Sequence, residues 1–340
     1  MNDRGRQDLT IWTVVRLGVA AAALAQVQTG AAAGAGECDR LCLEAIGDQY
    51  RAAYLAHDPA QAPISRRVRF VENNVEMPFP DATWDTVTRE VGTPLTLSDP
   101  VNGQVGIYTA IMQNDTPGFL SIRLKVEGGL ITEIEHIIST RRNLSAPPTP
   151  IGDVETFRHS PHLAEAVPAA KCRPRAELVR LADGYFETLE NNDGTIRGTR
   201  FSPTATRHEN GMAFAEIEKG FLSGRYLFNE RVRDRDHFLV DEYRCIVMAR
   251  GFIDHKGVLD SYTLTDGTPA RSVFREPHSW AFLEMFKIED GMITGVEASF
   301  IGAPYNMRSP YTLNPDPIRS RQAKIEARAA AAERARSAGN

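Results

Sequence analysis

The chain has 340 residues, and its composition of 42% hydrophobic, 24% charged and 8% aromatic residues is ordinary for a globular protein. This length predicts about two domains. The formal net charge of -5, with no long basic stretch before the C-terminal tail, argues against a nucleic-acid-binding protein.

The first 37 residues have the pattern of a secretory signal. Arg4, Arg6 and Arg16 precede the apolar run LGVAAAALA at 17–25, and small residues follow. The run is about half as long as a membrane-spanning helix requires. We therefore expect a leader over residues 1–37, export to the periplasm or the medium, and no membrane span in the mature protein. A disordered Ala/Gly leader is the alternative.

Export would place the four cysteines, Cys38, Cys42, Cys172 and Cys245, in an oxidising compartment. Four cysteines can pair in three ways. Cys38 and Cys42 are one turn apart, where an internal bridge is awkward. The expectation is therefore a disulfide from this segment to Cys172 or Cys245, with free buried thiols as the alternative. No His or carboxylate accompanies the cysteines at ligand spacing, so we expect no metal site.

Three sequence landmarks occur twice, in the same order. Asp48 and Tyr50 match Asp183 and Tyr185 (183 − 48 = 135), Glu72-Asn73 matches Glu209-Asn210 (209 − 72 = 137), and GLITEIEHI at 129–137 matches GMITGVEAS at 291–299 (291 − 129 = 162). The sequence therefore predicts two copies of one unit, the second with 25 extra residues (162 − 137) between its last two landmarks.

Each copy is predicted to begin with an amphipathic helix. In the second copy its apolar stripe is Leu178, Leu181, Ala182, Tyr185, Phe186 and Leu189. The Glu-Asn strand follows, then a short helix near 213–221 and alternating segments at 237–255 and 280–303, with a hairpin turn at 289–291. Helices followed by a curved antiparallel sheet indicate an α+β fold.

Domain boundaries follow from this pattern. We expect a first domain at 38–143, a linker at 144–171 that contains five prolines, a second domain at 172–312, and an Ala/Arg-rich tail at 313–340.

The order helix, strand, helix, curved sheet resembles the nuclear transport factor 2-like (SnoaL-like) superfamily. The phrases GLITEIE, RHENG, VRDRDHFLVDEYR and FKIEDGMITGVEASFIGAPYNMRSPY also resemble an uncharacterised family of exported bacterial and fungal proteins with two such units, over about residues 38–312. The resemblance implies two tandem cone-shaped domains, each with a pocket between helix and sheet. Members include ketosteroid isomerase, dehydratases, cyclases and cofactor-free lyases, whereas others only bind ligands or serve as assembly modules. Their local catalytic motifs cannot be placed on this chain.

The two copies differ where a pocket would lie. Copy one has Phe70 where copy two has Arg207, and Ile122 where copy two has Glu284 (284 − 162 = 122). Glu284 shares strand parity with Phe286, so it should face inward. A carboxylate on a buried face is costly unless it is paired or used, which makes Glu284 the first candidate for a catalytic group.

Arg207 and Glu209 are two residues apart and share a strand face, so they could form a polar pocket floor with Glu284. Burial would raise a carboxyl pKa towards the range of acid–base catalysis, and the guanidinium would oppose that shift. The alternative is a structural ion pair, which the match between Glu72 and Glu209 favours.

Further candidates are weaker. Asp241 could serve as a base or only open a turn, His278 could lie at the cone mouth or in solvent, and Tyr185 could donate a proton or pack in the core. Asn210, Phe286 and Tyr305 are expected to bind the substrate.

The chain lacks the G-x-S-x-G, P-loop, G-x-G-x-x-G and H-E-x-x-H motifs. We therefore expect no cofactor. The leading hypothesis is an exported lyase, dehydratase or isomerase that acts on a hydrophobic, aromatic or polycyclic small molecule, with a homodimer allowed. Glu284 or Asp241 would abstract a proton, Arg207 would stabilise an oxyanion, and Tyr185 or His278 would donate a proton back. The rivals are a binding protein with the same pocket and a structural module of the cell envelope.

Overall fold

The computed structural model describes residues 38–141, 150–160, 162–214, 216–255 and 259–317. The expected leader, and the tail from residue 318, lie outside the described residues.

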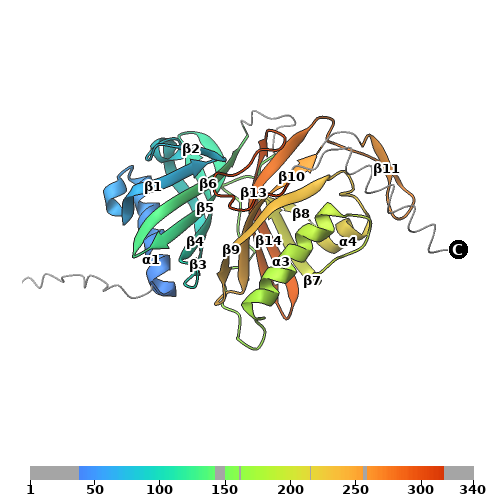
Figure 1. Ribbon diagram of the computed structural model, residues 1–340, viewed down its shortest axis with the longest axis horizontal. Helices are drawn as coiled ribbons and strands as arrows, with labels where there is room; N and C mark the ends of the chain where they lie inside the picture. Colours follow the sequence, from blue (N-terminus) through green and yellow to red (C-terminus); the bar gives the residue numbers. More distant parts are fainter. Residues whose placement is uncertain (1–37, 142–149, 161, 215, 256–258, 318–340) are drawn as a thin grey trace, which may run out of the picture. The chain divides into compact units, whose positions relative to one another are not determined.

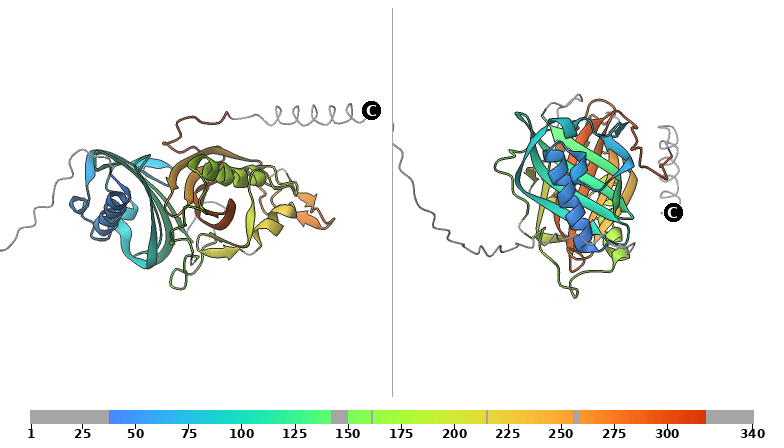
Figure 2. Two further views of the ribbon diagram at one scale, coloured as in Figure 1. Left: turned by 90° about the horizontal axis from the view of Figure 1, so that it is seen from below. Right: turned by 90° about the vertical axis from the view of Figure 1, so that its left-hand side faces the viewer.

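The N-terminal half (38–141) is one sheet with a long helix on one face (Figure 1 and the right-hand view of Figure 2). Its elements are α1 (Arg40–Leu55), the 3-10 turn η1 (Pro59–Gln61), β1 (Ile64–Glu72), β2 (Val75–Met77), α2 (Thr83–Thr86), β3 (Val87–Asp99), β4 (Gln104–Gln113), β5 (Thr116–Glu127) and β6 (Leu130–Thr140). The strand order is β2-β1-β6-β5-β4-β3. Asp39 caps α1 by accepting a hydrogen bond from the Cys42 amide.

The C-terminal half (172–317) has the same arrangement. Its elements are α3 (Arg175–Glu190), β7 (Phe201–Glu209), β8 (Met212–Phe214), α4 (Ile217–Leu222), β9 (Arg231–Asp241), β10 (Ile246–His255), β11 (Ser261–Thr263), β12 (Pro269–Arg271), β13 (His278–Glu289) and β14 (Met292–Ala303). The sheet order β8-β7-β14-β13-β10-β9 repeats that of the first sheet position by position. The small hairpin β11–β12 falls within the extra residues of this half.

Both sheets fit the expected α+β class, but they are mixed rather than purely antiparallel. β1 pairs in parallel with β6, and β7 pairs in parallel with β14. The expectation of an antiparallel sheet was wrong on this point because side chains alternate with the same period in both kinds of strand. The expected hairpin between β13 and β14 is present, and Asp290 and Gly291 have the positive φ angles of 50° and 76° that it requires.

Three hydrophobic clusters hold the described chain together. One lies under α1 and includes Tyr50 and Trp84, and a second lies under α3 and includes Tyr185. The third lies between the two sheets, where Leu239 and Met248 pack with residues of β3 to β6. The sheets therefore bury both of their faces.

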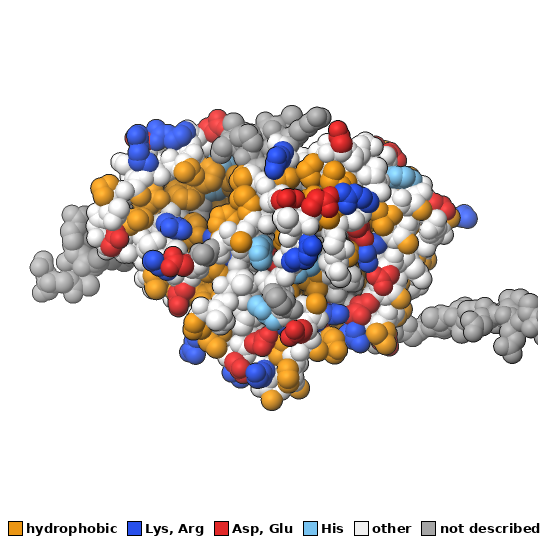
Figure 3. All heavy atoms as spheres, turned by 180° about the vertical axis from the view of Figure 1, so that it is seen from behind, with side chains coloured by type: hydrophobic (Ala, Val, Ile, Leu, Met, Phe, Trp, Pro, Cys, Tyr) orange, Lys and Arg blue, Asp and Glu red, His pale blue; other side chains and the backbone are white. Residues whose placement is uncertain are grey.

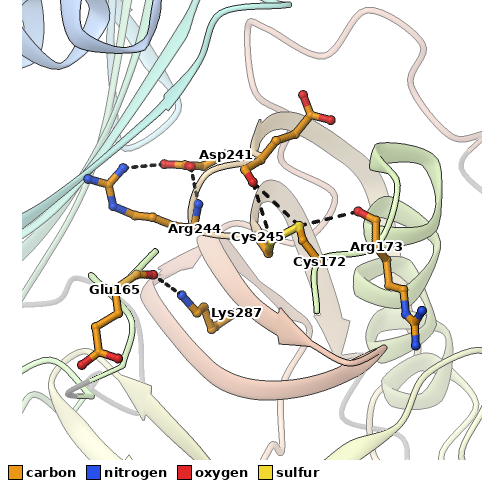
Figure 4. The surroundings of a disulfide bond; sticks show 8 residues. Glu165, Cys172, Arg173, Asp241, Arg244, Cys245 and Lys287 are labelled. Atoms are coloured by element: carbon orange, nitrogen blue, oxygen red, sulfur yellow. Dashed lines mark hydrogen bonds and ion pairs between the residues drawn. A yellow bond between two sulfur atoms is a disulfide. The ribbon is translucent and has the colours of Figure 1, made fainter. Parts of the chain in front are cut away.

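The segment that we expected to be a linker packs into this third cluster. Ile151, Val154, Phe157 and Leu163 are all buried there. The Lys287 ammonium also donates a hydrogen bond to the carbonyl of Glu165 at 2.6 Å (Figure 4). The described part of this segment therefore belongs to the core between the sheets.

The disulfides differ from the expected pairing. Cys38 bonds to Cys42, and Cys172 bonds to Cys245 (Figure 4). The expected cross-link between the N-terminal segment and the second half is wrong. Cys38 precedes the helix, which begins at Arg40, and the Cα atoms of Cys38 and Cys42 are only 5.3 Å apart, within the usual range for a disulfide.

No described helix combines the length and apolar character that are needed to cross a membrane. On the face drawn in Figure 3, acidic and basic side chains lie close to one another rather than in separate fields.

Candidate functional site

The C-terminal half contains a cavity of about 380 Å³ that is lined by α3 and the inner face of its sheet. Most of its wall is apolar or aromatic, formed by Pro150, Leu189, Met212, Phe214, Tyr226, Phe228, Ile253, Val273, Phe274, Trp280 and Phe300. The polar lining residues are Tyr185, Arg207, Glu209, Asn210, Asn229, His255 and Glu284. An aromatic cavity with a few convergent polar groups is the common form of a small-molecule site.

Glu284 faces the interior of this half, as strand parity predicted. Its neighbours Leu283 and Met285 point into the cluster between the sheets, while Phe286 joins the cluster under α3. Glu284 is 0% exposed, and neither of its carboxyl oxygens has a hydrogen-bond partner among the described residues. Burial, reinforced by the nearby charge of Glu209, raises the pKa of Glu284 well above its ordinary value. Burial therefore favours the protonated, neutral form of the Glu284 carboxyl group.

Arg207 and Tyr185 oppose this rise in the pKa of Glu284, but the hydrogen bonds of the Arg207 guanidinium go to two tyrosines. Its Nη1 donates a hydrogen bond to the Tyr185 hydroxyl at 3.3 Å, and its Nη2 donates to the Tyr226 hydroxyl at 2.7 Å. Its carboxylate contact is Glu209, with 3.4 Å between Nε and Oε1. The guanidinium also lies 5.0 Å from the centre of the Phe214 ring. The structure thus places Tyr185, Arg207, Glu209 and Glu284 around one space.

Glu209 and its counterpart Glu72 have different surroundings. In the first half, Glu72 accepts a hydrogen bond from the Thr83 amide at the start of α2 and lies 3.4 Å from His136 Nδ1. Glu209 instead contacts Arg207 and lines the cavity, with its side chain 29% exposed. The structural role that the match suggested applies to Glu72, whereas Glu209 faces the cavity.

Asn210 lines the cavity, but its side chain is engaged by the next strand. Its Oδ1 accepts from the Phe300 amide at 2.7 Å, and its Nδ2 donates to the Phe300 carbonyl at 3.1 Å. Asn73 makes the matching bond to Ile138 in the first half, and both asparagines have a positive φ, 50° and 49°. The repeated asparagine thus joins the end of one strand to its parallel neighbour in each half.

The structure places four other candidates away from the cavity lining. Asp241 is buried between the halves, where it accepts hydrogen bonds from the Ser98 amide and from Arg244 (Figure 4). Phe286 is a core residue whose ring lies 5.0 Å from that of Tyr185. Tyr305 donates a hydrogen bond to Glu230, and His278 packs behind the cavity wall.

Sequence reasoning did not single out His255, which is only the last residue of the alternating segment at 237–255. His255 is the last residue of β10, pairs in register with His278 and lines the cavity. His278, which we predicted at the cone mouth, is thus the strand partner of His255, and it is His255 that borders the cavity. The aromatic residues Phe228, Phe274 and Trp280 were also missed, since nothing in their spacing separates them from core residues.

The corresponding space in the N-terminal half is filled. Trp84 Nε1 donates to the Tyr50 hydroxyl at 3.0 Å, and Tyr50 is bonded to His136 Nε2 at 2.7 Å. The offsets pair Trp84 with Phe221 (84 + 137) and His136 with Ala298 (136 + 162), so copy two has smaller residues at both positions. Phe221 packs against Tyr185 with ring centroids 5.1 Å apart, as Trp84 packs against Tyr50 at 5.5 Å.

Among the described residues, no group of three or more His, Cys, Asp or Glu side chains is arranged to hold a metal ion.

Residues 171–300 match a family model described as a domain of unknown function (DUF8021). No curated protein shows significant similarity to the chain. Among solved structures, AclR of Streptomyces galilaeus, described as a candidate hydroxylase, is 14% identical, with a TM-score of 0.26 over 40% of this chain and 93% of that one. A candidate ketosteroid isomerase from Kribbella flavida is also 14% identical, with a TM-score of 0.22 over 37% of this chain and 95% of that one. The descriptions as hydroxylase and ketosteroid isomerase refer to those two proteins.

Proposed function

We propose that this chain is an exported, cofactor-free acid–base enzyme, a lyase, dehydratase or isomerase, that acts on a hydrophobic aromatic or polycyclic molecule in the cavity of the C-terminal half. The observation that carries the proposal is Glu284, a fully buried carboxyl group on the wall of that cavity, whose pKa is raised by burial. Its oxygens lack a hydrogen-bond partner in the described part of the chain.

A carboxyl group with a purely structural role would be expected to have hydrogen-bond or ion-pair partners, unlike Glu284. Buried carboxylates that stabilise a fold are ionised and paired, because an unpaired buried polar group costs about 1–3 kcal/mol. Arg207 is available nearby, yet it donates to Tyr185 and Tyr226 and pairs with Glu209. This arrangement brings two carboxyl groups, Glu284 and Glu209, and the guanidinium of Arg207 together on the lining of a mostly apolar cavity.

These three groups suit a proton shift next to a carbonyl group. Glu209 would accept a proton from the carbon beside the carbonyl. Arg207 and Tyr226 would stabilise the negative charge that develops on the oxygen, and Glu284 would supply a proton to it. Transfer of the proton from Glu209 to a different carbon, with return of the enol O–H proton to Glu284, completes an isomerisation. If Glu209 instead gives its proton to a hydroxyl group on the next carbon, that group leaves as water while the enol O–H proton returns to Glu284, and the reaction is a dehydration.

Export is part of the proposal and is supported by two observations. The N-terminal pattern is that of a secretory signal. Both disulfides are of a kind that persists in oxidising compartments.

Deuterium exchange tests the chemistry without knowledge of the product. Aromatic ketones such as 2-tetralone are incubated with the protein in deuterated buffer, and loss of the proton next to the carbonyl is followed by NMR. We expect wild-type protein to accelerate the exchange, and Glu284→Gln to reduce that acceleration by about 100-fold or more while the protein stays folded.

The N-terminal half supplies the matched control. Ile122 occupies the position of Glu284 in the filled interior, so Ile122→Gln should lower stability and leave exchange by the folded fraction unchanged. A Glu284→Gln protein with full exchange activity would contradict the catalytic role. Ketone binding without exchange would support the binding-protein alternative instead.

A further inference from the structure

His255 is a second polar feature of the same cavity, apart from the group around Glu284. It is 2% exposed, and its Nε2 bonds to Asn229 Oδ1 at 2.7 Å; both residues line the cavity. The amide oxygen can only accept, so Nε2 carries the hydrogen and Nδ1 carries a lone pair. Burial, with a further contribution from His278, lowers the pKa of His255 to about 3, so the ring is neutral at physiological pH.

The Nδ1 atom of His255 has no hydrogen-bond partner among the residues that the structure describes. The ring is held in place by its neighbours, with centroid distances of 4.0 Å to Phe274 and 4.8 Å to His278. A buried acceptor without a donor costs about 1–3 kcal/mol, and the cost is removed when a ligand supplies the donor. His255 is thus a fixed, neutral acceptor that lacks a donor.

The distance between the two polar regions sets the size of the ligand. In the pairing of β10 with β13, Glu284 lies opposite Ala249, and His255 is six residues further along β10 (255 − 249). At about 3.3 Å per residue, the backbone positions are separated by roughly 20 Å along the strand. Side chains that reach into the cavity from both ends shorten this span, but a single aromatic ring is too small to contact both.

We propose that the ligand is an elongated molecule of two or more rings, with a carbonyl or phenol oxygen at Arg207 and a hydroxyl group that donates to Nδ1 of His255. This inference rests on the proposed function and adds the substrate class. The apolar wall between the two ends, which includes Phe228, Phe274 and Trp280, contacts the ring system. The Arg207 end recognises an acceptor and the His255 end recognises a donor, so they define the orientation of the ligand.

Matched phenols test the hydroxyl group. Binding of 4,4′-dihydroxystilbene is compared with that of 4-hydroxy-4′-methoxystilbene by fluorescence titration, and the corresponding biphenyl pair covers a shorter length. The methoxy group has a similar size but cannot donate a hydrogen bond. For wild-type protein we expect at least one dihydroxy compound to bind fivefold or more tightly than its methyl ether, beyond the twofold statistical advantage of a symmetric ligand.

Two variants locate the effect. His255→Phe keeps an aromatic ring and should reduce the preference to about twofold, whereas His278→Phe should retain it, because His278 is not among the lining residues. The wild-type preference is informative even if a variant fails to fold. Equal binding of each phenol and its ether would overturn the hydroxyl inference and leave the proposed function intact. Absence of phenol binding would also overturn the hydroxyl inference, and the deuterium-exchange experiment would then decide the proposed function separately. If Arg207→Gln leaves both the binding of every phenol and the ketone exchange unchanged, the proposed function fails as well.

Discussion

The interiors of the two halves have the same strand order but different contents. In the N-terminal half, Trp84, Tyr50 and His136 fill the space between helix and sheet with hydrogen-bonded aromatic rings. In the C-terminal half, the positions of Trp84 and His136 hold Phe221 and Ala298, and a cavity of about 380 Å³ remains.

The difference shows how one backbone can serve either as a packed core or as a candidate binding site. The polar substitutions are found where the space is: Arg207 replaces Phe70, and Glu284 replaces Ile122. A change of side-chain volume and a change of polarity therefore occur together in one half, which is the pattern expected if the cavity is used.

The largest expected effect on the free energy of unfolding comes from removing a large buried side chain from the interior of the N-terminal half. Trp84 is 1% exposed, so Trp84→Ala should lower the free energy of unfolding by about 4–5 kcal/mol through lost burial and a residual cavity. Trp280→Ala removes the same side chain from the wall of an existing cavity and should cost about 1–2 kcal/mol. Urea denaturation measures both, and equal costs would mean that the two interiors are packed alike.

The two disulfides differ in the loops that they close. Cys172 and Cys245 are separated by 73 residues, and Cys38 and Cys42 by four. Replacing both cysteines of the longer loop by Ala should lower the free energy of unfolding by about 4 kcal/mol, against about 2 kcal/mol for the short one. Thermal and urea unfolding of the two double variants would test this, and a larger loss for the short loop would refute the loop-closure argument.

The third prediction concerns pH. The pKa of Glu284 is raised in the folded protein, so above its unfolded value of about 4.5 the unfolded chain releases a proton that the folded chain retains. Rising pH should therefore destabilise wild-type protein relative to Glu284→Gln by about 1.4 kcal/mol per pH unit, until the folded pKa is reached. Ile122→Gln is the control, since its cost should not vary with pH. Parallel stability curves for wild type and Glu284→Gln would show that Glu284 is not held neutral.

The smallest expected effect on stability concerns a hydrogen bond between the two sheets. The Ser121 hydroxyl donates to that of Ser299 across the two sheets at 2.8 Å, and both side chains are fully buried. Either single change to Ala should cost about 1–2 kcal/mol by leaving one hydroxyl unpaired, whereas the double change should be nearly neutral. Additive losses in this double-mutant cycle would mean that the hydroxyl groups act independently.

Much of the candidate site could be predicted by comparing the chain with itself. Side-chain alternation placed Glu284 inward, and the parity of Arg207 and Glu209 placed them on one face, because these are local properties of a strand. Local pattern offered Asp241 either a catalytic role or the opening of a turn, and the structure shows the turn bond from the Arg244 amide. Its contact with Ser98 could not be predicted, because it depends on how the halves pack. His255 was missed because its role depends on its register with His278 on another strand.

The sequence by itself determined the order of the elements, the hairpin at Asp290 and Gly291, and the inward face of β13, since each follows from short-range pattern and backbone preference. Only the tertiary structure decided which strands pair in parallel, which cysteines bond, and which interior stays open. Those outcomes depend on distances between segments far apart in the chain and on whether side-chain volumes fill the space between them, and neither quantity is contained in a local pattern.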